Sequence, residues 1–186
     1  MKTRIALGLL AALTALPAYA ALDVGQRAPD FTAQASLGGK EFQFSLAQAL
    51  LRGPVVLYFY PAAFTKGCTI EAHDFAAAMD RYRALGATVI GVSHDGIEKL
   101  KKFSVSECRS KFAVAADTDQ HIMRAYDAVL AAKAQYADRT SYVIAPSGSI
   151  LYTYTIMHPD HHVANTLRAM RERWRGHIAH CADPAS

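Results

Sequence analysis

The order of hydrophobic and polar positions predicts alternating strands and helices. The run from Val55 to Tyr60 is continuously apolar, β-branched or aromatic, as expected for a strand buried on both faces. Thr88 to Ser93 has the same character. Between these two strands, apolar residues recur at three- and four-residue spacing, which predicts a helix from about Cys68 to Leu85 with one buried face and a cap at Gly86.

The rest of the pattern completes an α/β arrangement. Near the start it predicts a hairpin from Phe31 to Ser45 turning at Gly38-Gly39, and a short helix capped by Ser45 that runs to Leu51. After the second buried strand it predicts a helix from Ile97 to about Ser106, a weaker strand from Phe112 to Ala116 and a helix from about Asp119 to Tyr126. The chain then ends with strands from Thr140 to Ala145 and Ile150 to Tyr154 and a helix from about Asp160 to about Ile178. Strands alternating with helices, then a hairpin and a last helix, predict a thioredoxin-like fold: a central mixed β-sheet flanked by helices, with an N-terminal β-hairpin.

The first twenty residues have the pattern of an export signal. Lys2 and Arg4 precede an apolar run of about 12 residues, and Ala18-Tyr19-Ala20 forms a small-residue cleavage site. The run is shorter than the roughly 20 residues that a membrane-spanning helix needs. We therefore expect a signal peptide over 1–20, cleavage after Ala20, export to the periplasm, and one domain over 21–186 with its core at about 24–178.

Composition and charge limit the function classes. A chain of 186 residues, 52% of them hydrophobic, is long enough for one domain with a sizeable core. The first twenty residues hold two of the twenty Lys and Arg and no Asp or Glu, which leaves a formal charge of +2 on the remainder. This charge is too small to indicate a nucleic-acid partner. No later stretch is apolar enough to span a membrane, so no membrane association is expected after cleavage.

Three cysteines, Cys68, Cys108 and Cys181, are an odd number for an exported chain. Disulfides form and persist in oxidising compartments, so an odd count leaves at least one thiol free or only transiently paired. The cysteine count therefore already indicates thiol chemistry.

Cys68 is placed in the first turn of its predicted helix, just beyond a buried strand. Unpaired backbone N–H groups and the positive end of the helix dipole favour its thiolate, the reactive form. Arg139, at the start of the strand that begins at Thr140, is the candidate cation because that strand lies close to this turn in a thioredoxin-type sheet and a forked guanidinium can hold a thiolate. Thr65 has a hydroxyl that can donate and accept. Pro61 has no N–H and can shield the sulfur from water.

The residues around Cys68 resemble the active-site signature of peroxiredoxins, Pro61-x-x-x-Thr65-x-x-Cys68. The longer sequence around this signature is most similar to the branch of bacterioferritin comigratory protein and peroxiredoxin Q. The similarity extends from about Val24 to about Arg175, and it includes the segments Phe59-Tyr60-Pro61, Gly67-Cys68-Thr69-x-Glu71, Leu85 to Ser93 and Arg139 to Ile144.

This resemblance implies a thiol-dependent peroxidase for hydrogen peroxide or organic hydroperoxides. Cys68 would attack the peroxide and become a sulfenic acid. Arg139 and Thr65 would hold the peroxide, Pro61 would shield the pocket, and Glu71 would position Arg139. The family implies no metal, haem or flavin cofactor, a thioredoxin-like or other thiol reductant as partner, and a monomer or homodimer.

The chain departs from this branch at His73, where many members place a resolving cysteine. Cys108 is the first choice for that role, and its alternative is a buried, inert residue. Cys181 could instead resolve, or pair with Cys108 as a structural disulfide. If neither resolves, an external thiol must do so.

A periplasmic thioredoxin-like thiol-disulfide oxidoreductase is the alternative function, although such proteins use Cys-x-x-Cys and Thr65 occupies the first cysteine position. Two histidine groups remain. His94-Asp95 follows a strand and could contribute to the active-site face. His158, His161 and His162 are interpreted as a solvated cluster at a helix start, although His158 and His162 have a spacing that would suit a metal.

Overall fold

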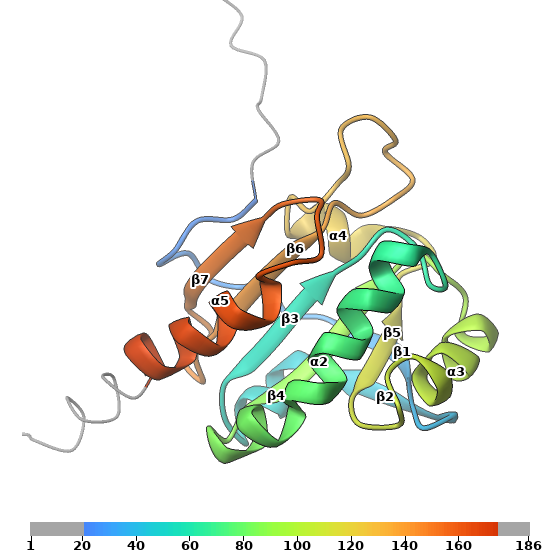
Figure 1. Ribbon diagram of the computed structural model, residues 1–186. Coiled ribbons are helices and arrows are strands. Elements are labelled where there is room, and N and C mark those ends of the chain that lie inside the picture. Colours follow the sequence, from blue (N-terminus) through green and yellow to red (C-terminus); the bar gives the residue numbers. More distant parts are fainter. Residues whose placement is uncertain (1–20, 175–186) are drawn as a thin grey trace, which may run out of the picture.

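The computed structural model describes residues 21–174, which form one seven-stranded sheet with helices on both faces (Figure 1). The elements follow the expected order: β1 (Thr32–Leu37), β2 (Lys40–Ser45), α1 (Leu46–Leu50), β3 (Val55–Phe59), α2 (Lys66–Ala84), β4 (Thr88–Ser93), α3 (Ile97–Ser106), β5 (Ala113–Ala116), α4 (His121–Ala125), β6 (Thr140–Ile144), β7 (Ile150–Thr155), α5 (His162–Ala169) and a π-helical turn over Met170–Trp174.

The sheet is mixed, with strand order β2-β1-β5-β4-β3-β6-β7. Strand β3 lies between β4, with which it runs parallel, and β6, with which it runs antiparallel. All five residues of β3 are buried, as the continuous apolar run predicts. The segment that leads from β3 into α2 therefore starts at the centre of the sheet.

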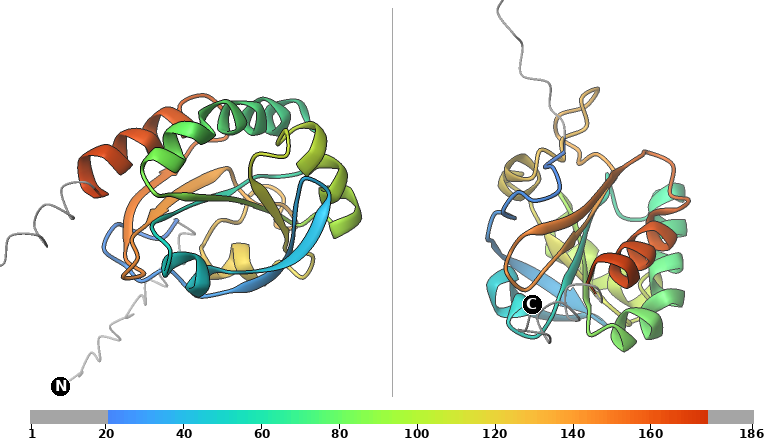
Figure 2. Two further views of the ribbon diagram at one scale, coloured as in Figure 1. Left: turned by 90° about the horizontal axis from the view of Figure 1, so that it is seen from below. Right: turned by 90° about the vertical axis from the view of Figure 1, so that its left-hand side faces the viewer.

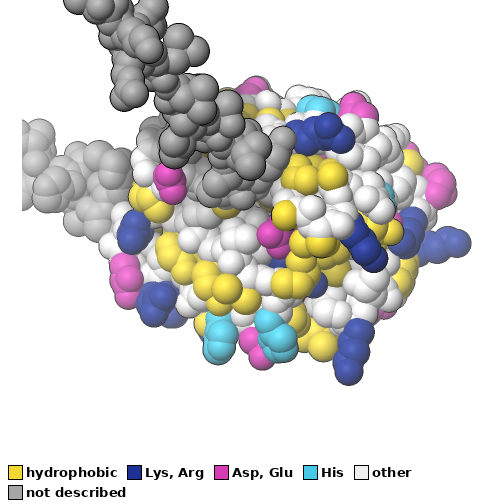
Figure 3. Space-filling view, turned by 90° about the horizontal axis from the view of Figure 1, so that it is seen from above, with side chains coloured by type: hydrophobic (Ala, Val, Ile, Leu, Met, Phe, Trp, Pro, Cys, Tyr) yellow, Lys and Arg dark blue, Asp and Glu magenta, His cyan; other side chains and the backbone are white. Residues whose placement is uncertain are grey.

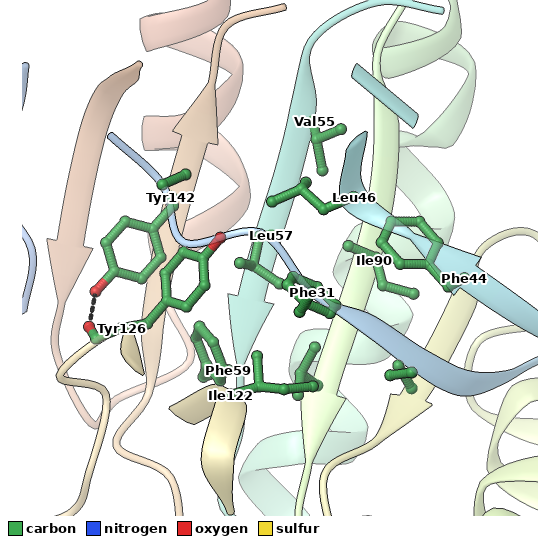
Figure 4. Packing of buried hydrophobic residues seen from close by; sticks show 14 of the residues in the cluster. Phe31, Phe44, Leu46, Val55, Leu57, Phe59, Ile90, Ile122, Tyr126 and Tyr142 are labelled. Atoms are coloured by element: carbon green, nitrogen blue, oxygen red, sulfur yellow. Dashed lines mark hydrogen bonds between the residues drawn. The ribbon is translucent and has the colours of Figure 1, made fainter. Parts of the chain in front are cut away.

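The side chains of β3 alternate between two apolar clusters, one on each face. Leu57 and Phe59 point into the cluster shown in Figure 4, where the Tyr142 hydroxyl donates to the Tyr126 carbonyl at 2.6 Å. Val56 and Tyr58 point into the opposite cluster, which contains Cys68 and Cys108. Figure 2 shows α2, α3 and α5 over this second face, whereas α1 and α4 cover the first.

Several local expectations are confirmed by named contacts. Ser45 caps α1 by accepting a hydrogen bond from Gln48 N at 3.3 Å. The β1–β2 hairpin turns at Gly38-Gly39, and Gly86 has the left-handed φ of 70° that suits a cap after α2. The predicted fold class is therefore confirmed.

The boundaries differ by one or two residues at several helix ends. Helix α2 begins two residues before Cys68 and ends one residue before the predicted Leu85. Helices α4 and α5 each begin two residues later than predicted, because Gln120 and His161 adopt left-handed φ values of 65° and 73° that helical residues do not adopt. The expected signal peptide, Cys181 and the last part of the predicted C-terminal helix lie outside the described residues.

No helix within residues 21–174 is long and apolar enough to cross a membrane. Figure 3 shows the end of the molecule at which α2 begins, and on the face drawn basic and acidic side chains are interspersed. This distribution fits the small net charge.

Candidate active site

Cys68 is the third residue of α2 and lies in the helix's first turn, as predicted. Its exposed fraction is 2%, and its side chain lies in the apolar cluster between α2 and the sheet. The first-turn position places the sulfur at the positive end of the helix dipole, which stabilises an anion. The fold thus buries a nucleophile at the one end of the helix where a thiolate is favoured.

The guanidinium of Arg139 lies directly against this sulfur. Nη2 of Arg139 is 3.4 Å from Sγ of Cys68, and only 3% of Arg139 is exposed. Nε donates to the Met157 carbonyl at 2.8 Å, and Nη1 donates to the Glu71 carboxyl. These three contacts fix the planar guanidinium in one orientation. The predicted approach of Arg139 to Cys68 is therefore present in the structure.

Gly67 permits this close approach. A Cβ atom at position 67 would lie 3.1 Å from Nη2 of Arg139, closer than ordinary van der Waals contact. The residue immediately before Cys68 must therefore be small for the guanidinium to keep its place.

Glu71 is fully buried one turn after Cys68 and pairs with Arg139. Burial raises the pKa of Glu71 to about 8, although the charge of Arg139 acts in the opposite direction. Burial alone would lower the pKa of Arg139, but the neighbouring Glu71 and Cys68 raise it above its usual value. The cation facing the sulfur is thus permanent, whereas the carboxyl behind it can hold a proton near neutral pH.

The loop before α2 carries Pro61 and Thr65. Pro61 is partly buried, and Thr65 is exposed at the N-cap position. The Thr65 hydroxyl donates to the Ala62 carbonyl at 3.0 Å rather than capping the helix. Phe64 between them has a left-handed φ of 67° and packs edge-on against Phe103 with ring centroids 5.2 Å apart. A strained, packed residue holds the loop in a single shape.

His94 and Asp95, which the sequence marked only weakly, anchor that loop. Nδ1 of His94 donates to the Pro61 carbonyl at 3.0 Å, since a carbonyl oxygen can only accept. The buried Asp95 carboxylate accepts from Ala63 N at 2.6 Å and pairs with Lys99 at 2.7 Å. The end of β4 and the start of α3 are therefore both tied to the loop.

Cys108, the predicted resolving cysteine, is fully buried after α3 in the same apolar cluster as Cys68. Burial raises the pKa of the Cys108 thiol far above its usual range. Both cysteines are free thiols in the described part of the chain. In this conformation Cys108 is therefore protonated and unreactive.

The segment around Cys108 is held by strained and exposed contacts. Arg109 and Ser110 have consecutive left-handed φ values of 51° and 54°. Glu107 pairs with His73 on α2, with Nε2 and Oε2 2.9 Å apart. His73 is 38% exposed, as expected for a partly exposed helix residue. The side chain at the position of the missing cysteine thus contacts the residue next to Cys108.

The histidines at the start of α5 are not one solvated cluster, which corrects the prediction. His158 and His161 are exposed, and His158 lies 3.2 Å from Asp160. His162 is completely buried between α5 and the sheet, with Nδ1 2.8 Å from the Ser141 hydroxyl. The four-residue spacing of the buried positions His162, Thr166 and Met170 is the signal that could have placed it on the inner face of the helix.

One group of candidate metal ligands occurs within residues 21–174: Asp117, Asp119 and His121, whose ligand atoms lie within 4.8 Å of one another. The buried Asp117 carboxylate accepts from Ile122 N at 3.0 Å and Met123 N at 2.8 Å. Asp119 lies 2.6 Å from His121 Nδ1. These contacts account for the group as the cap of α4.

A family model described as AhpC/TSA family matches residues 24–153. The chain belongs to this family. It is 41% identical over 107 residues to the putative peroxiredoxin bcp of Helicobacter pylori strain J99, covering 58% of this chain and 67% of that protein. It is 29% identical over 158 residues to peroxiredoxin Bcp of Bacillus subtilis strain 168, covering 81% of this chain and 96% of that protein.

A solved structure of the same branch has the same fold. Peroxidoxin BcpB from Mycobacterium tuberculosis superimposes with a TM-score of 0.73 at 27% identity, covering 81% of this chain and 97% of that one. The predicted resemblance to the Bcp and peroxiredoxin Q branch is confirmed by these AhpC/TSA relatives. Membership of this family supports a thiol-dependent peroxidase over a thiol-disulfide oxidoreductase.

Proposed function

We propose that the chain is a thiol-dependent peroxidase in which Cys68 reduces hydrogen peroxide or an organic hydroperoxide. The observation that supports this most strongly is the Arg139 guanidinium, held by Glu71 and the Met157 carbonyl at 3.4 Å from the sulfur. A fixed cation with several donors stabilises both a thiolate and the charge that develops on a peroxide oxygen.

In the first step the Cys68 thiolate attacks the terminal oxygen of the peroxide. The S–O bond forms as the O–O bond breaks, and the leaving oxygen takes a proton to become water or an alcohol. The sulfur is oxidised to a sulfenic acid and the peroxide is reduced by two electrons. Arg139 stabilises the negative charge as it moves from sulfur to the leaving oxygen. The Thr65 hydroxyl, which donates to the Ala62 carbonyl, accepts from the O–H of the bound peroxide, and Pro61 shields the sulfur.

In the second step we assign Cys108 as the resolving thiol. Its sulfur attacks the sulfenic sulfur of Cys68, which forms a disulfide and releases water. Because Cys108 is fully buried with a raised pKa, the segment after α3 must open before this step. The strained turn at Arg109 and Ser110 is the part of this segment that opening relaxes. An external dithiol, such as a thioredoxin-like protein, then reduces the disulfide.

The remaining assignments rest on the sequence. The pattern of residues 1–20 supports export to the periplasm with cleavage after Ala20. Cys181 is the alternative resolving residue, and a monomer or homodimer is the expected assembly. Amino-terminal sequencing of the chain recovered from a periplasmic extract tests the export and the cleavage site together.

The product at each cysteine tests the proposed reaction. The reduced protein is mixed with one equivalent of hydrogen peroxide, quenched, and analysed by mass spectrometry. We expect a Cys68–Cys108 disulfide in the wild type and a persistent sulfenic acid on Cys68 in Cys108→Ser. A Cys68–Cys181 disulfide would reassign the resolving residue, and an unmodified Cys68 would overturn the peroxidase assignment. Disulfide transfer without peroxide consumption would favour the oxidoreductase alternative.

A further inference from the structure

His162 lies completely buried at the start of α5. This helix packs beside α2, as Figure 1 shows. Nε2 of His162 lies 2.9 Å from the Ile156 carbonyl, which can only accept, so this nitrogen carries a hydrogen. The ring is thereby fixed with Nδ1 directed toward the interior.

Nδ1 of His162 faces the buried carboxyl of Glu71. The distance from Nδ1 to Oε1 of Glu71 is 3.7 Å. Oε1 is fully buried and has no hydrogen-bond partner within residues 21–174, while the other carboxyl oxygen accepts from Arg139. A buried carboxylate oxygen without a hydrogen-bond donor is unfavourable, and a proton on Glu71 or on His162 removes this penalty.

We propose that Glu71 and His162 share one buried proton. His162 is thereby a positioning residue: it keeps Glu71 from competing with the Cys68 thiolate for the positive charge of Arg139. Whether the proton resides on the carboxyl or on the imidazole, the Glu71–His162 pair as a whole is neutral. This inference rests on the proposed function only for its effect on peroxide reduction.

Counting charges explains why the shared proton matters. With Cys68 as thiolate, Arg139 as cation and Glu71 as bare carboxylate, the buried group would carry one net negative charge. One proton on the Glu71–His162 pair makes the group neutral, and a buried net charge is strongly disfavoured. Without that proton, the thiolate and the carboxylate compete for one guanidinium.

The surroundings allow either location of the proton. The hydroxyl of Ser141, 2.8 Å from Nδ1, can donate to a neutral imidazole or accept from a charged one. Burial raises the pKa of Glu71 to about 8 and lowers that of His162 to about 4. At neutral pH the proton therefore resides mainly on the carboxyl. The titratable and charged groups around the pair come from several elements: Cys68, Asp74 and Tyr82 of α2, Tyr58 of β3, Arg139 beside β6, Tyr154 of β7 and the neighbouring His161.

The first test substitutes the imidazole. His162→Gln keeps an N–H that can reach the Ile156 carbonyl but removes the nitrogen that faces Glu71. We expect the rate of Cys68 oxidation by hydrogen peroxide to fall about twofold at neutral pH and up to about tenfold well above pH 8, as one pKa unit of linkage gives for a carboxyl whose pKa is about 8. At acidic pH, where Glu71 is protonated without help, the rate should not fall. His158→Gln, the same substitution at an exposed histidine four residues earlier, is the matched control and should leave the rate unchanged.

A double-mutant comparison separates this linkage from a general structural effect. Glu71→Gln makes position 71 permanently neutral while keeping an acceptor for Arg139. In that background, His162→Gln should lower the rate measured above pH 8 by less than about twofold, because the proton it helps to hold is no longer needed. An equal tenfold loss in both backgrounds would overturn the proposal and leave His162 as a packing residue.

A spectroscopic measurement on the wild type tests the proton itself, whether or not the variants fold. In the wild type at neutral pH, the ¹³C shift of the Glu71 carboxyl carbon should be that of a protonated carboxylic acid, or the ¹⁵N shifts of His162 should be those of a charged imidazole. An ionised Glu71 beside a neutral His162 would overturn the proposal. This outcome differs from a failure of the proposed function, in which peroxide would leave Cys68 unmodified while the proton was still present.

Discussion

Cys68 and Cys108 lie in the same apolar cluster and are equally hidden from solvent, yet their surroundings differ in kind. Cys68 begins a long helix and touches a fixed guanidinium at 3.4 Å. Cys108 follows the end of a helix, and its burial raises the pKa of its thiol. Burial alone therefore does not predict thiol reactivity. The two sulfurs differ in the charge beside them, and we expect their reactivity toward peroxide to follow that difference.

The largest expected effect comes from removing that charge. Arg139→Gln should lower the rate constant for oxidation of Cys68 by hydrogen peroxide about 10²- to 10³-fold, the usual loss when a preorganised charge stabiliser is deleted. Competition kinetics against a peroxidase of known rate measures this constant. Arg124→Gln, at an exposed arginine that pairs with Gln120, is the control and should retain the wild-type rate. A loss below about threefold would remove Arg139 from the mechanism.

The second effect compares the two thiols directly. At neutral pH, alkylation of Cys108 by iodoacetamide should be about 10²-fold slower than that of Cys68, because Cys108 reacts only after its segment opens locally. Mass spectrometry of peptides after timed quenching gives both rates in one sample. In a denaturing concentration of urea the two rates should converge. Equal rates in the folded protein would contradict the contrast drawn between the two sites.

A smaller effect follows from the close approach at Gly67. Gly67→Ala should lower the rate of Cys68 oxidation about tenfold, equivalent to roughly 1.4 kcal/mol, by moving Nη2 of Arg139 away from the sulfur. The helix itself should not weaken, since alanine favours helix more than glycine does. Rate and urea stability measured together separate the two effects. A destabilised protein with an unchanged rate would refute this reading of Gly67.

The smallest effect concerns the contact beside Cys108. Glu107→Gln removes the ion pair with His73 and should speed formation of the Cys68–Cys108 disulfide about two- to fivefold, in line with the weak energy of a half-exposed pair. Rapid quenching after peroxide addition follows the disulfide. Lys101→Gln breaks a pair between α3 and Glu41 at the other side of the helix and should change this rate less. If the Cys68–Cys108 disulfide formed more slowly in Glu107→Gln, the contact with His73 would be assisting disulfide formation rather than resisting the opening of the Cys108 segment.

The sequence predicted the fold and the core of the site because both depend on local pattern. The apolar run of β3, the spacing of buried residues in α2 and the caps at Ser45 and Gly86 are each decided by a few neighbouring residues. Arg139 was predicted from the place of its strand in a thioredoxin-type sheet, and Glu71 from the resemblance to peroxiredoxins; the structure brings both together at Cys68.

Features that depend on packing between distant elements were not predictable in the same way. The burial of His162 results from α5 packing against α2 and β6, and the His94 and Asp95 contacts with the active-site loop join segments more than 30 residues apart. The pairing of His73 with Glu107 is a similar case. A local pattern shows which face of a helix is apolar, but not which polar group it will meet.

The most direct test of the contrast between the two cysteines is the second-order rate constant for hydrogen peroxide in the wild type, Cys68→Ser and Cys108→Ser. We predict that Cys108→Ser keeps the wild-type constant within about twofold, because Cys108 acts only after the peroxide bond is broken. We predict that Cys68→Ser falls to the rate of an ordinary free cysteine. A loss of rate in Cys108→Ser, or an unchanged rate in Cys68→Ser, would contradict the account.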